Sequence, residues 1–166
     1  GHRTLRLLHW GLVPFWAKDR AIGNRMINAR SETAASKPAF RAAFSRRRCL
    51  LPVDGFYEWV AQEEGPKQPY HIHLPERAPF TFAGLWERWD KDPEVGTLDS
   101  CTILTCAASE AMEPYHHRMP VIVEAGDWPL WLGEEGHGAA RLMLAGLLKP
   151  AFVLMVEGES DFLRAT

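Results

Sequence analysis

The sequence predicts one domain of mixed α and β structure, and two observations carry that prediction. Proline and glycine, with 12 and 13 residues, are spread along all 166 positions and divide the chain into many short elements. Several of these elements are rich in β-branched and aromatic residues, which favour strands, while others have the alanine and leucine content of short helices. No linker, repeat or change of composition divides the chain, so we expect a single domain over residues 1–166.

The N-terminal third is predicted to contain a strand and a helix. Residues 6–14 mix apolar and polar side chains and are closed by Gly11 and Pro14, which indicates a strand that leads into a loop. Residues 36–44 place alanine and phenylalanine at helical spacing, with Pro38 where a first turn tolerates a missing N–H.

The middle of the chain has the strongest strand signals. Residues 49–53 and 56–60 flank Asp54-Gly55, a dipeptide that favours a two-residue type I′ hairpin. Further strands are predicted at residues 69–74, 80–87 and 100–107. Short helices are predicted from Asp127, a candidate cap, to residue 132, and over residues 138–148.

Composition limits the classes of function. The chain is 46% hydrophobic and 24% charged, which suits an ordinary core, and its net charge of −2 argues against a strongly basic nucleic-acid coat without excluding a local arginine groove. Cys49, Cys101 and Cys106 are an odd set without CxxC spacing, so neither a disulfide framework nor a zinc ribbon is indicated. With no membrane-spanning run and no signal-peptide pattern, we expect a protein of the reducing cytosol.

Glu58 is the candidate acid–base residue. Alternation along a strand places Phe56 and Glu58 on one face and Tyr57 and Trp59 on the other. If Phe56 faces the core, burial raises the pKa of the Glu58 carboxyl group, which can then accept and donate a proton near neutral pH. A solvated glutamate, or an ion pair with an arginine, is the structural alternative.

Two other segments add an amide and an imidazole. Extended backbone would direct Asn28 and Arg30 to one face, where the amide could orient a reacting group and the guanidinium could hold a phosphate. A capping Asn and a solvent-facing Arg would explain the same residues. In an extended segment, His116 and Arg118 would also share a face. Either His116 or His117 is the candidate for an imidazole that titrates in function.

Other clusters carry weaker signals. His71 and His73 share a strand face, but no third ligand has a fixed spacing, so no metal site is predicted. The chain has 7 tryptophans, most of which belong in the core, although exposed ones could stack on unpaired bases. The three arginines at residues 46–48 fit either a solvated face or a phosphate track.

Over about residues 7–132, the chain resembles the SOS response-associated peptidase (SRAP) family. The resemblance rests on a series of motifs in one order: Trp10-Gly11-Leu12-Val13-Pro14, Asn28-Ala29-Arg30-Ser31-Glu32, Lys37-Pro38-Ala39-Phe40-Arg41, Pro52-Val53-Asp54-Gly55-Phe56-Tyr57-Glu58-Trp59, Phe82-Ala83-Gly84-Leu85-Trp86 and His116-His117-Arg118-Met119-Pro120. Each motif alone has little specificity, but six motifs in the same order make a chance resemblance very unlikely.

The resemblance implies an α+β fold around a strongly bent, barrel-like antiparallel sheet with short flanking helices. It also implies a cytosolic monomer of the DNA damage response that binds abasic sites in single-stranded DNA, including junctions with duplex, without a cofactor. In this family, removal of the initiator methionine exposes an N-terminal cysteine. Its α-amine forms a Schiff base with the sugar aldehyde, and its thiol closes a thiazolidine ring.

The resemblance also implies roles for particular residues. Asn28 would position the N-terminal nucleophile, Glu58 would move protons during imine formation and methionine removal, and His116 would assist opening of the sugar ring. Four residues would contact the DNA, Arg30 and Arg118 at phosphates and Trp10 and Trp59 around the position of the missing base.

The chain departs from the family at its ends. Family members begin Met-Cys-Gly, whereas this chain begins Gly1-His2-Arg3, and its three cysteines are expected to be small core residues. We therefore expect a domain truncated at the N-terminus, and divergent or truncated after about residue 150. A non-catalytic module that binds single-stranded DNA or DNA junctions is the alternative, and a hydrolase that uses Glu58 and His116 on a small molecule is a third.

Overall fold

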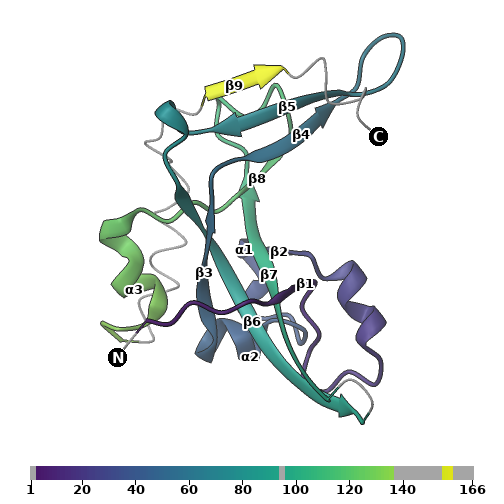
Figure 1. Cartoon of the computed structure of the whole chain (residues 1–166), viewed down its shortest axis with the longest axis vertical. Coiled ribbons are helices and arrows are strands. Elements are labelled where there is room, and N and C mark those ends of the chain that lie inside the picture. The colour runs from purple at the N-terminus through teal and green to yellow at the C-terminus, as the bar shows by residue number, and fades with distance from the viewer. Residues whose placement is uncertain (1–2, 94–95, 137–154, 159–166) are drawn as a thin grey trace.

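The computed structural model describes residues 3–93, 96–136 and 155–158, and it confirms the predicted α+β class (Figure 1). The larger sheet contains β1 (His9–Trp10), β2 (Asn28–Arg30), β3 (Arg48–Val53), β6 (Phe80–Asp92), β7 (Gly96–Ala107) and β8 (Arg118–Pro120). The smaller sheet contains β4 (Phe56–Val60), β5 (Gln68–His73) and β9 (Met155–Gly158). The smaller sheet lies across one end of the long β6–β7 pair.

Strand β7 organises the larger sheet because it pairs with four other strands. Strands β6 and β8 run antiparallel to β7, whereas β1 and β2 run parallel to it. Strand β3 continues the sheet on the far side of β6, in antiparallel register. The expected antiparallel pairing therefore holds for the long strands, but the two short ones make the sheet mixed. In the described part of the chain, β1 and β3 end the main strand order, so the sheet does not close into a barrel.

The predicted hairpin at Asp54-Gly55 is wrong. Strand β3 pairs with β6 and strand β4 pairs with β5, so the chain passes from one sheet to the other at this dipeptide. Gly55 does not have the positive φ that a type I′ turn requires. Glycine is needed here for close approach, since a Cβ would lie 2.2 Å from His71 Nε2 and 2.9 Å from the carbonyl oxygen of Ile72.

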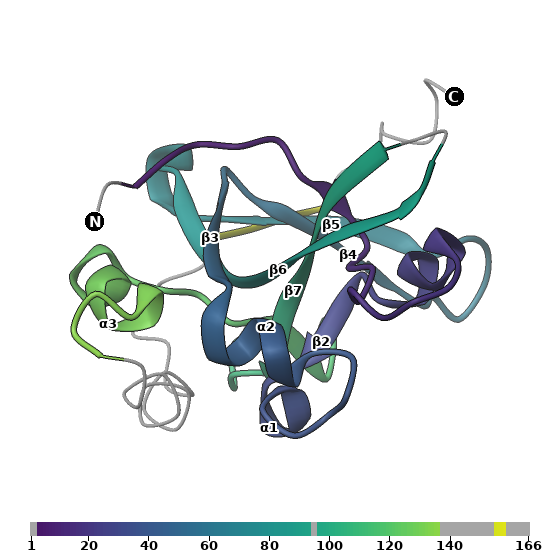
Figure 2. The same cartoon turned by 90° about the horizontal axis from the view of Figure 1, so that it is seen from below.

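Short helices lie around the two sheets (Figure 2): η1 (Arg20–Arg25), α1 (Ser31–Ala34), α2 (Arg41–Arg46), η2 (Pro75–Arg77), η3 (Ala125–Asp127) and α3 (Trp128–Leu132). The helix predicted over residues 36–44 is observed only from Arg41, because the residues before it, Pro38 included, form turns. Helix α3 is confirmed, but its N-cap residue Asp127 makes no capping hydrogen bond through its side chain. The helix predicted over residues 138–148 lies outside the described residues.

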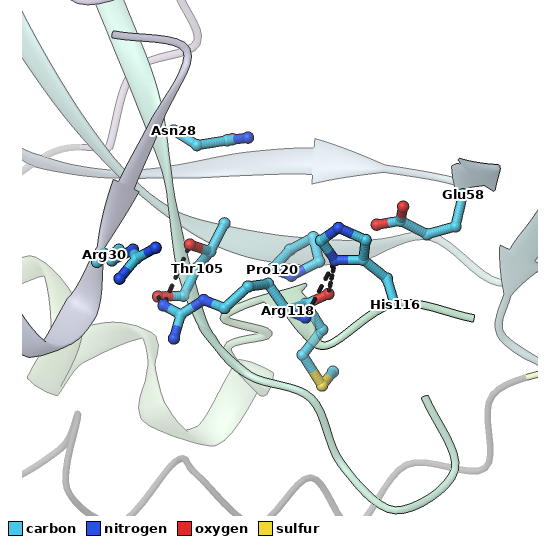
Figure 3. A pocket seen from close by; sticks show the side chains of 8 residues that line it. Asn28, Arg30, Glu58, Thr105, His116, Arg118 and Pro120 are labelled. Atoms are coloured by element: carbon cyan, nitrogen blue, oxygen red, sulfur yellow. Dashed lines mark hydrogen bonds between the residues drawn. The ribbon is translucent and has the colours of Figure 1, made fainter. Parts of the chain in front are cut away.

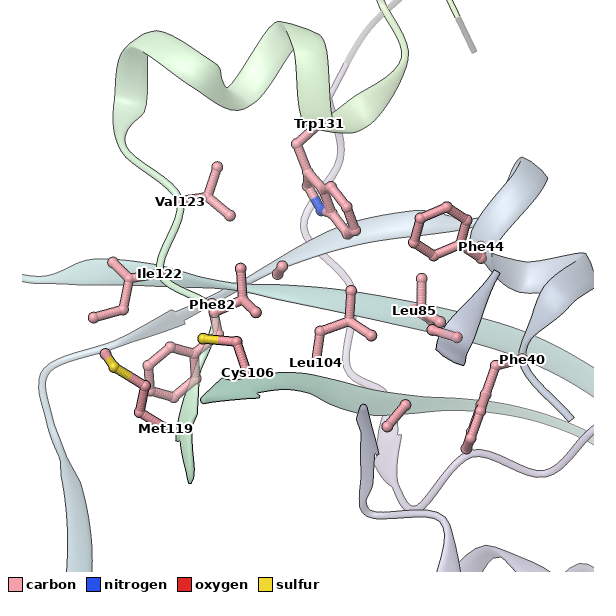
Figure 4. Packing of buried hydrophobic residues seen from close by; sticks show 14 of the residues in the cluster. Phe40, Phe44, Phe82, Leu85, Leu104, Cys106, Met119, Ile122, Val123 and Trp131 are labelled. Carbon is pink, nitrogen blue, oxygen red and sulfur yellow. The ribbon is translucent and has the colours of Figure 1, made fainter. Parts of the chain in front are cut away.

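The core lies between the larger sheet and the helices α2 and α3 (Figure 4). Trp131 of α3 is fully buried, and its ring meets that of Phe44 of α2 edge-on at 6.2 Å. Its indole N–H donates to the carbonyl oxygen of Cys49 at 2.8 Å, which ties α3 to β3. Leu85 and Leu104 fill the same cluster from β6 and β7. This packing fixes the sheet edge from which β4 departs.

The arginine run at residues 46–48 is mostly structural. Arg48 is buried and donates to the carbonyl oxygens of Phe44, Ser45 and Trp131. Arg47 pairs with the buried Glu87. Neither of the sequence-based alternatives, a solvated face or a phosphate track, describes Arg47 and Arg48.

The loop after β1 brings Trp10 next to β2. Only residues 9 and 10 of the strand predicted over 6–14 are extended in the sheet. Gly11 has a φ of 125°, and a Cβ there would lie 2.7 Å from the carbonyl oxygen of Gly23. This close approach lets the indole N–H of Trp10 donate to the carbonyl oxygen of Ile27 at 2.8 Å. Trp10 is therefore anchored one residue before Asn28.

Within the described residues, no helix has the length and apolar character needed to span a membrane.

Candidate active site

A pocket of about 270 Å³ lies where the two sheets meet (Figure 3). Its lining residues come from β2, β4, the end of β7, and β8 with the segment that leads into it: Asn28, Arg30, Glu58, Thr105, His116, Arg118, Met119 and Pro120. Sequence-distant segments therefore contribute an amide, a carboxyl group, an imidazole and two guanidinium groups to one site.

Strand β2 delivers Asn28 and Arg30 to the pocket. Alternation along the strand buries Ala29 and leaves Asn28 and Arg30 on the other side, as the sequence predicts. Parallel pairing with β7 aligns Arg30 with Thr105, another lining residue. The register of β2 on β7 thus sets where the amide and the guanidinium lie.

Strand β4 places Glu58 opposite His116. The ring of Phe56 packs edge-on against that of Phe82 at 5.6 Å, so the apolar neighbour on Glu58's strand face does point into the core. Burial raises the pKa of the Glu58 carboxyl group, and the nearby His116 opposes that rise. Figure 3 shows this carboxyl group directed toward the imidazole ring.

Backbone groups of Arg118 hold His116 in place. Its Nδ1 lies 3.0 Å from the Arg118 N–H, which donates to it, and 2.9 Å from the Arg118 carbonyl oxygen. With a proton on Nδ1, the ring donates to the Arg118 carbonyl oxygen in both its neutral and its charged form, so Nε2 can gain or lose a proton without the ring moving. This leaves Nε2 for the pocket. His117 is exposed, and its ring lies 4.4 Å from that of His116 in a tilted arrangement without lining the pocket.

The guanidinium of Arg118 is engaged on two sides. Its Nη1 and Nη2 donate to the two carboxylate oxygens of Glu32 at 2.6 and 2.9 Å, and Nη2 also donates to the Thr105 carbonyl oxygen at 2.6 Å. The hydrogen bonds between the two side chains raise the pKa of Arg118 and lower that of Glu32. Arg30, by contrast, is exposed beside the pocket.

The two predicted tryptophans lie outside the pocket lining. Trp10 is 55% exposed and Trp59 is 48% exposed, so both present aromatic surface to solvent. The ring of Trp59 lies 6.0 Å from that of Tyr57, which itself stacks on His71 at 4.8 Å. Alternation therefore separates the face of β4 that carries Glu58 from the face that carries Tyr57 and Trp59.

Sequence reasoning missed some of the site. Thr105 was inside a predicted strand but carried no signal of its own, and Met119 and Pro120 belonged to a motif without being assigned a role. Glu32, two residues after Arg30, forms an ion pair with Arg118. Their opposite charges are the only sequence signal that could have indicated this pair.

The cysteines are core residues, as predicted. Cys101 and Cys106 are buried, and Cys49 is half-buried. Burial raises the pKa of the Cys49 thiol to about 12, which leaves it a poor nucleophile at neutral pH. None of the three lines the pocket as the described residues form it. Those residues also contain no group of three His, Cys, Asp or Glu side chains arranged to hold a metal ion.

The fold and the pocket define an α+β protein whose acid, imidazole and amide meet at the junction of two sheets. The chain belongs to the SOS response associated peptidase (SRAP) family, whose model it matches over residues 1–156.

The chain is also similar to named relatives. The chain is 47% identical over 131 residues to "Abasic site processing protein YoqW" of Bacillus subtilis, covering 79% of the chain and 58% of that protein. It is 33% identical over 146 residues to "Abasic site processing protein HMCES" of Xenopus tropicalis, covering 75% and 43%. The chain thus spans about half the length of the curated relatives it matches.

Solved structures share the fold. A crystal structure of a protein from Bacteroides thetaiotaomicron has a TM-score of 0.83 and 28% identity, covering 96% of this chain and 71% of that one. A second, from Bordetella bronchiseptica, has a TM-score of 0.76 and 29% identity, covering 92% and 75%.

Proposed function

We propose that this chain forms the catalytic pocket of an abasic-site processing protein. In this proposal it binds single-stranded DNA at an abasic site, at junctions with duplex as well, and is joined to the lesion through an N-terminal cysteine. The observation that carries the proposal is the meeting of Asn28, Glu58 and His116 in one polar pocket of an SRAP chain. The names of its relatives support the choice of substrate.

Glu58 is the proton-transfer group. An α-amine has a pKa near 8, so part of it is neutral in the cell and attacks the carbon of the sugar aldehyde. The resulting carbinolamine loses water when its hydroxyl group gains a proton. A carboxyl group whose pKa is raised by burial can donate that proton and later accept one. The same group assists removal of the initiator methionine.

His116 opens the sugar ring. Ring opening takes a proton from the anomeric hydroxyl group and gives one to the ring oxygen. An imidazole whose Nδ1 is held by the backbone in both charge states can relay these protons through Nε2. The aldehyde so formed is the electrophile for the amine. The thiol then adds to the imine carbon and closes the thiazolidine.

The remaining residues bind and orient. Asn28 positions the α-amine through its amide, and Arg30 and Arg118 hold the phosphates on either side of the lesion. The exposed rings of Trp10 and Trp59 pack against the DNA next to the missing base.

A denaturing gel tests the proposal. The chain as printed, and the chain extended by an N-terminal segment beginning Met-Cys-Gly, are incubated with single-stranded DNA that contains one abasic site. We expect a covalent adduct from the extended protein alone, and slower adduct formation and methionine removal in its Glu58→Gln variant. Binding without any adduct from the extended protein would favour the non-catalytic module. An adduct from the chain as printed would contradict the requirement for an N-terminal cysteine.

A further inference from the structure

Glu32 lies outside the pocket lining but forms a bidentate ion pair with Arg118, which is inside it. The exposed fraction of the Arg118 side chain is 18%, and that of Glu32 is 47%. Two parallel hydrogen bonds join them, an arrangement that fixes the plane of the guanidinium as well as its position. Thr105 of β7 holds the same group from a second element.

The held guanidinium keeps an unused donor. An arginine has five N–H groups, and the contacts with Glu32 and Thr105 take three. The Nε–H is buried and has no partner among the described residues. An unpaired buried donor is costly, so a ligand atom that accepts from it gains more than one that accepts from a solvated lysine or arginine.

We infer that Glu32 is a positioning residue, which holds the Arg118 guanidinium so that its free N–H groups meet a phosphate of a nucleotide inserted in the pocket. The inference rests on the proposed function, because the anion is a DNA phosphate. An unrestrained arginine must lose side-chain freedom when it binds. The contact with Glu32 removes most of that freedom before DNA arrives.

The negative charge of Glu32 weakens DNA binding, whereas its hydrogen bonds to Arg118 favour it. Its carboxylate offsets the positive charge of Arg118, which lowers attraction for any nucleic acid backbone. Removing the charge should therefore maintain or strengthen binding of intact single-stranded DNA, which reaches the outer surface. An abasic nucleotide has no base, so it can enter the pocket and reach the Arg118 guanidinium that Glu32 holds in place. Removing the Glu32 charge should therefore weaken binding of the abasic strand.

The test compares Glu32→Gln with the unmodified chain and with Asp99→Asn. Asp99 receives the same bidentate contact from Arg88, at 2.7 and 2.8 Å, but neither residue lines the pocket. The probes are a single-stranded oligonucleotide with a stable tetrahydrofuran abasic analogue and the same oligonucleotide intact. We expect Glu32→Gln to lower the abasic-to-intact affinity ratio by about three- to tenfold. Affinity for the intact strand should hold or rise, and Asp99→Asn should keep the original ratio.

A second measurement separates this inference from the proposed function. In ¹⁵N NMR spectra of arginine side chains, the Arg118 Nε–H should be sharp in the unmodified chain and broadened in Glu32→Gln. If the unmodified chain shows no abasic preference, the proposed function fails while the NMR signal still tests the role of Glu32. An unchanged Nε–H signal in Glu32→Gln, or equal losses of affinity for both strands, would overturn the inference.

Discussion

At the scale of single residues, Glu58 links the chemistry of the pocket to the stability of the fold. Burial raises the pKa of its carboxyl group above the unfolded value, so the folded chain holds the proton more tightly than the unfolded chain does. The stabilising contribution is complete below the unfolded pKa and disappears as the pH rises through the folded one. At neutral pH the ionised carboxylate therefore opposes folding.

We predict that Glu58→Gln stabilises the chain at pH 7. The gain should be below about 1 kcal/mol, because Glu58 is only half-buried and solvent screens its charge. The gain should vanish below about pH 4, where the glutamate is protonated in both states. Urea unfolding at the two pH values measures it, with the exposed Glu63→Gln as the control. Equal stability of Glu58→Gln and the original chain at pH 7 would mean that burial does not penalise the ionised form.

Gly55 gives the second prediction at this scale. Gly55→Ala brings a Cβ within 2.9 Å of the backbone oxygen of Ile72, which cannot move without shifting β5. We expect a loss of about 1–3 kcal/mol in the free energy of unfolding. Gly126→Ala is the matched control, since a Cβ there meets nothing within 4 Å. If Gly55→Ala lowered the free energy of unfolding no more than Gly126→Ala, then Gly55 would not lie this close to β5.

Side-chain directions could be predicted from the sequence where local periodicity decides them. Alternation in β2 and β4 correctly paired Asn28 with Arg30 and Phe56 with Glu58, because side-chain direction in a strand depends only on position. The choice between His116 and His117 could not be made from sequence, since it depends on the backbone of Arg118 bonding one ring. Glu32 was missed for a related reason: its partner is 86 residues away.

At the scale of elements, Arg48 joins α2, β3 and α3. Its guanidinium donates to carbonyl groups at the end of α2 and in α3, where helix termini leave such oxygens without partners. The side chain also lies 5.9 Å from the centre of the Trp131 ring. One buried arginine thus connects α2, β3 and α3.

Replacing Arg48 should therefore destabilise the fold. We predict that Arg48→Met costs about 2 kcal/mol, because methionine fills similar space but leaves the carbonyl oxygens unpaired. Arg46→Met, a change in the exposed member of the same run, should change the free energy of unfolding by less than about 0.5 kcal/mol. Chemical denaturation of the two variants measures the difference. Similar values for both would remove Arg48 from this structural role.

The existence of most strands was predictable, but their partners were not. Strands β5, β6 and β7 coincide with apolar, β-branched segments, which is a local property. The Asp54-Gly55 dipeptide carried an equally local hairpin signal and was misleading, because the pairing of β4 with β5 and the approach of His71 override it. The helix expected over residues 36–44 was too long because turns occupy its first half.

At the scale of the whole molecule, the pocket exists because two sheets meet at one end of β7. Strand β2 pairs with that end, β8 pairs beside it, and β4 crosses from the smaller sheet. Composition and periodicity do not encode this meeting, since the contributing segments are spread from Asn28 to Pro120. The order of the family motifs anticipated it, and the geometry gives a physical reason for the motifs that contain Asn28, Glu58 and His116, which meet in the pocket.

The most direct test of this account is to locate the DNA on the chain by NMR. A single-stranded oligonucleotide with a tetrahydrofuran abasic analogue is titrated into labelled protein, with the intact oligonucleotide as reference. The account predicts that the side-chain amide of Asn28 and the imidazole of His116 shift with the abasic strand, and shift much less with the intact one. Shifts of equal size with both strands, or shifts confined to surfaces away from this pocket, would contradict it.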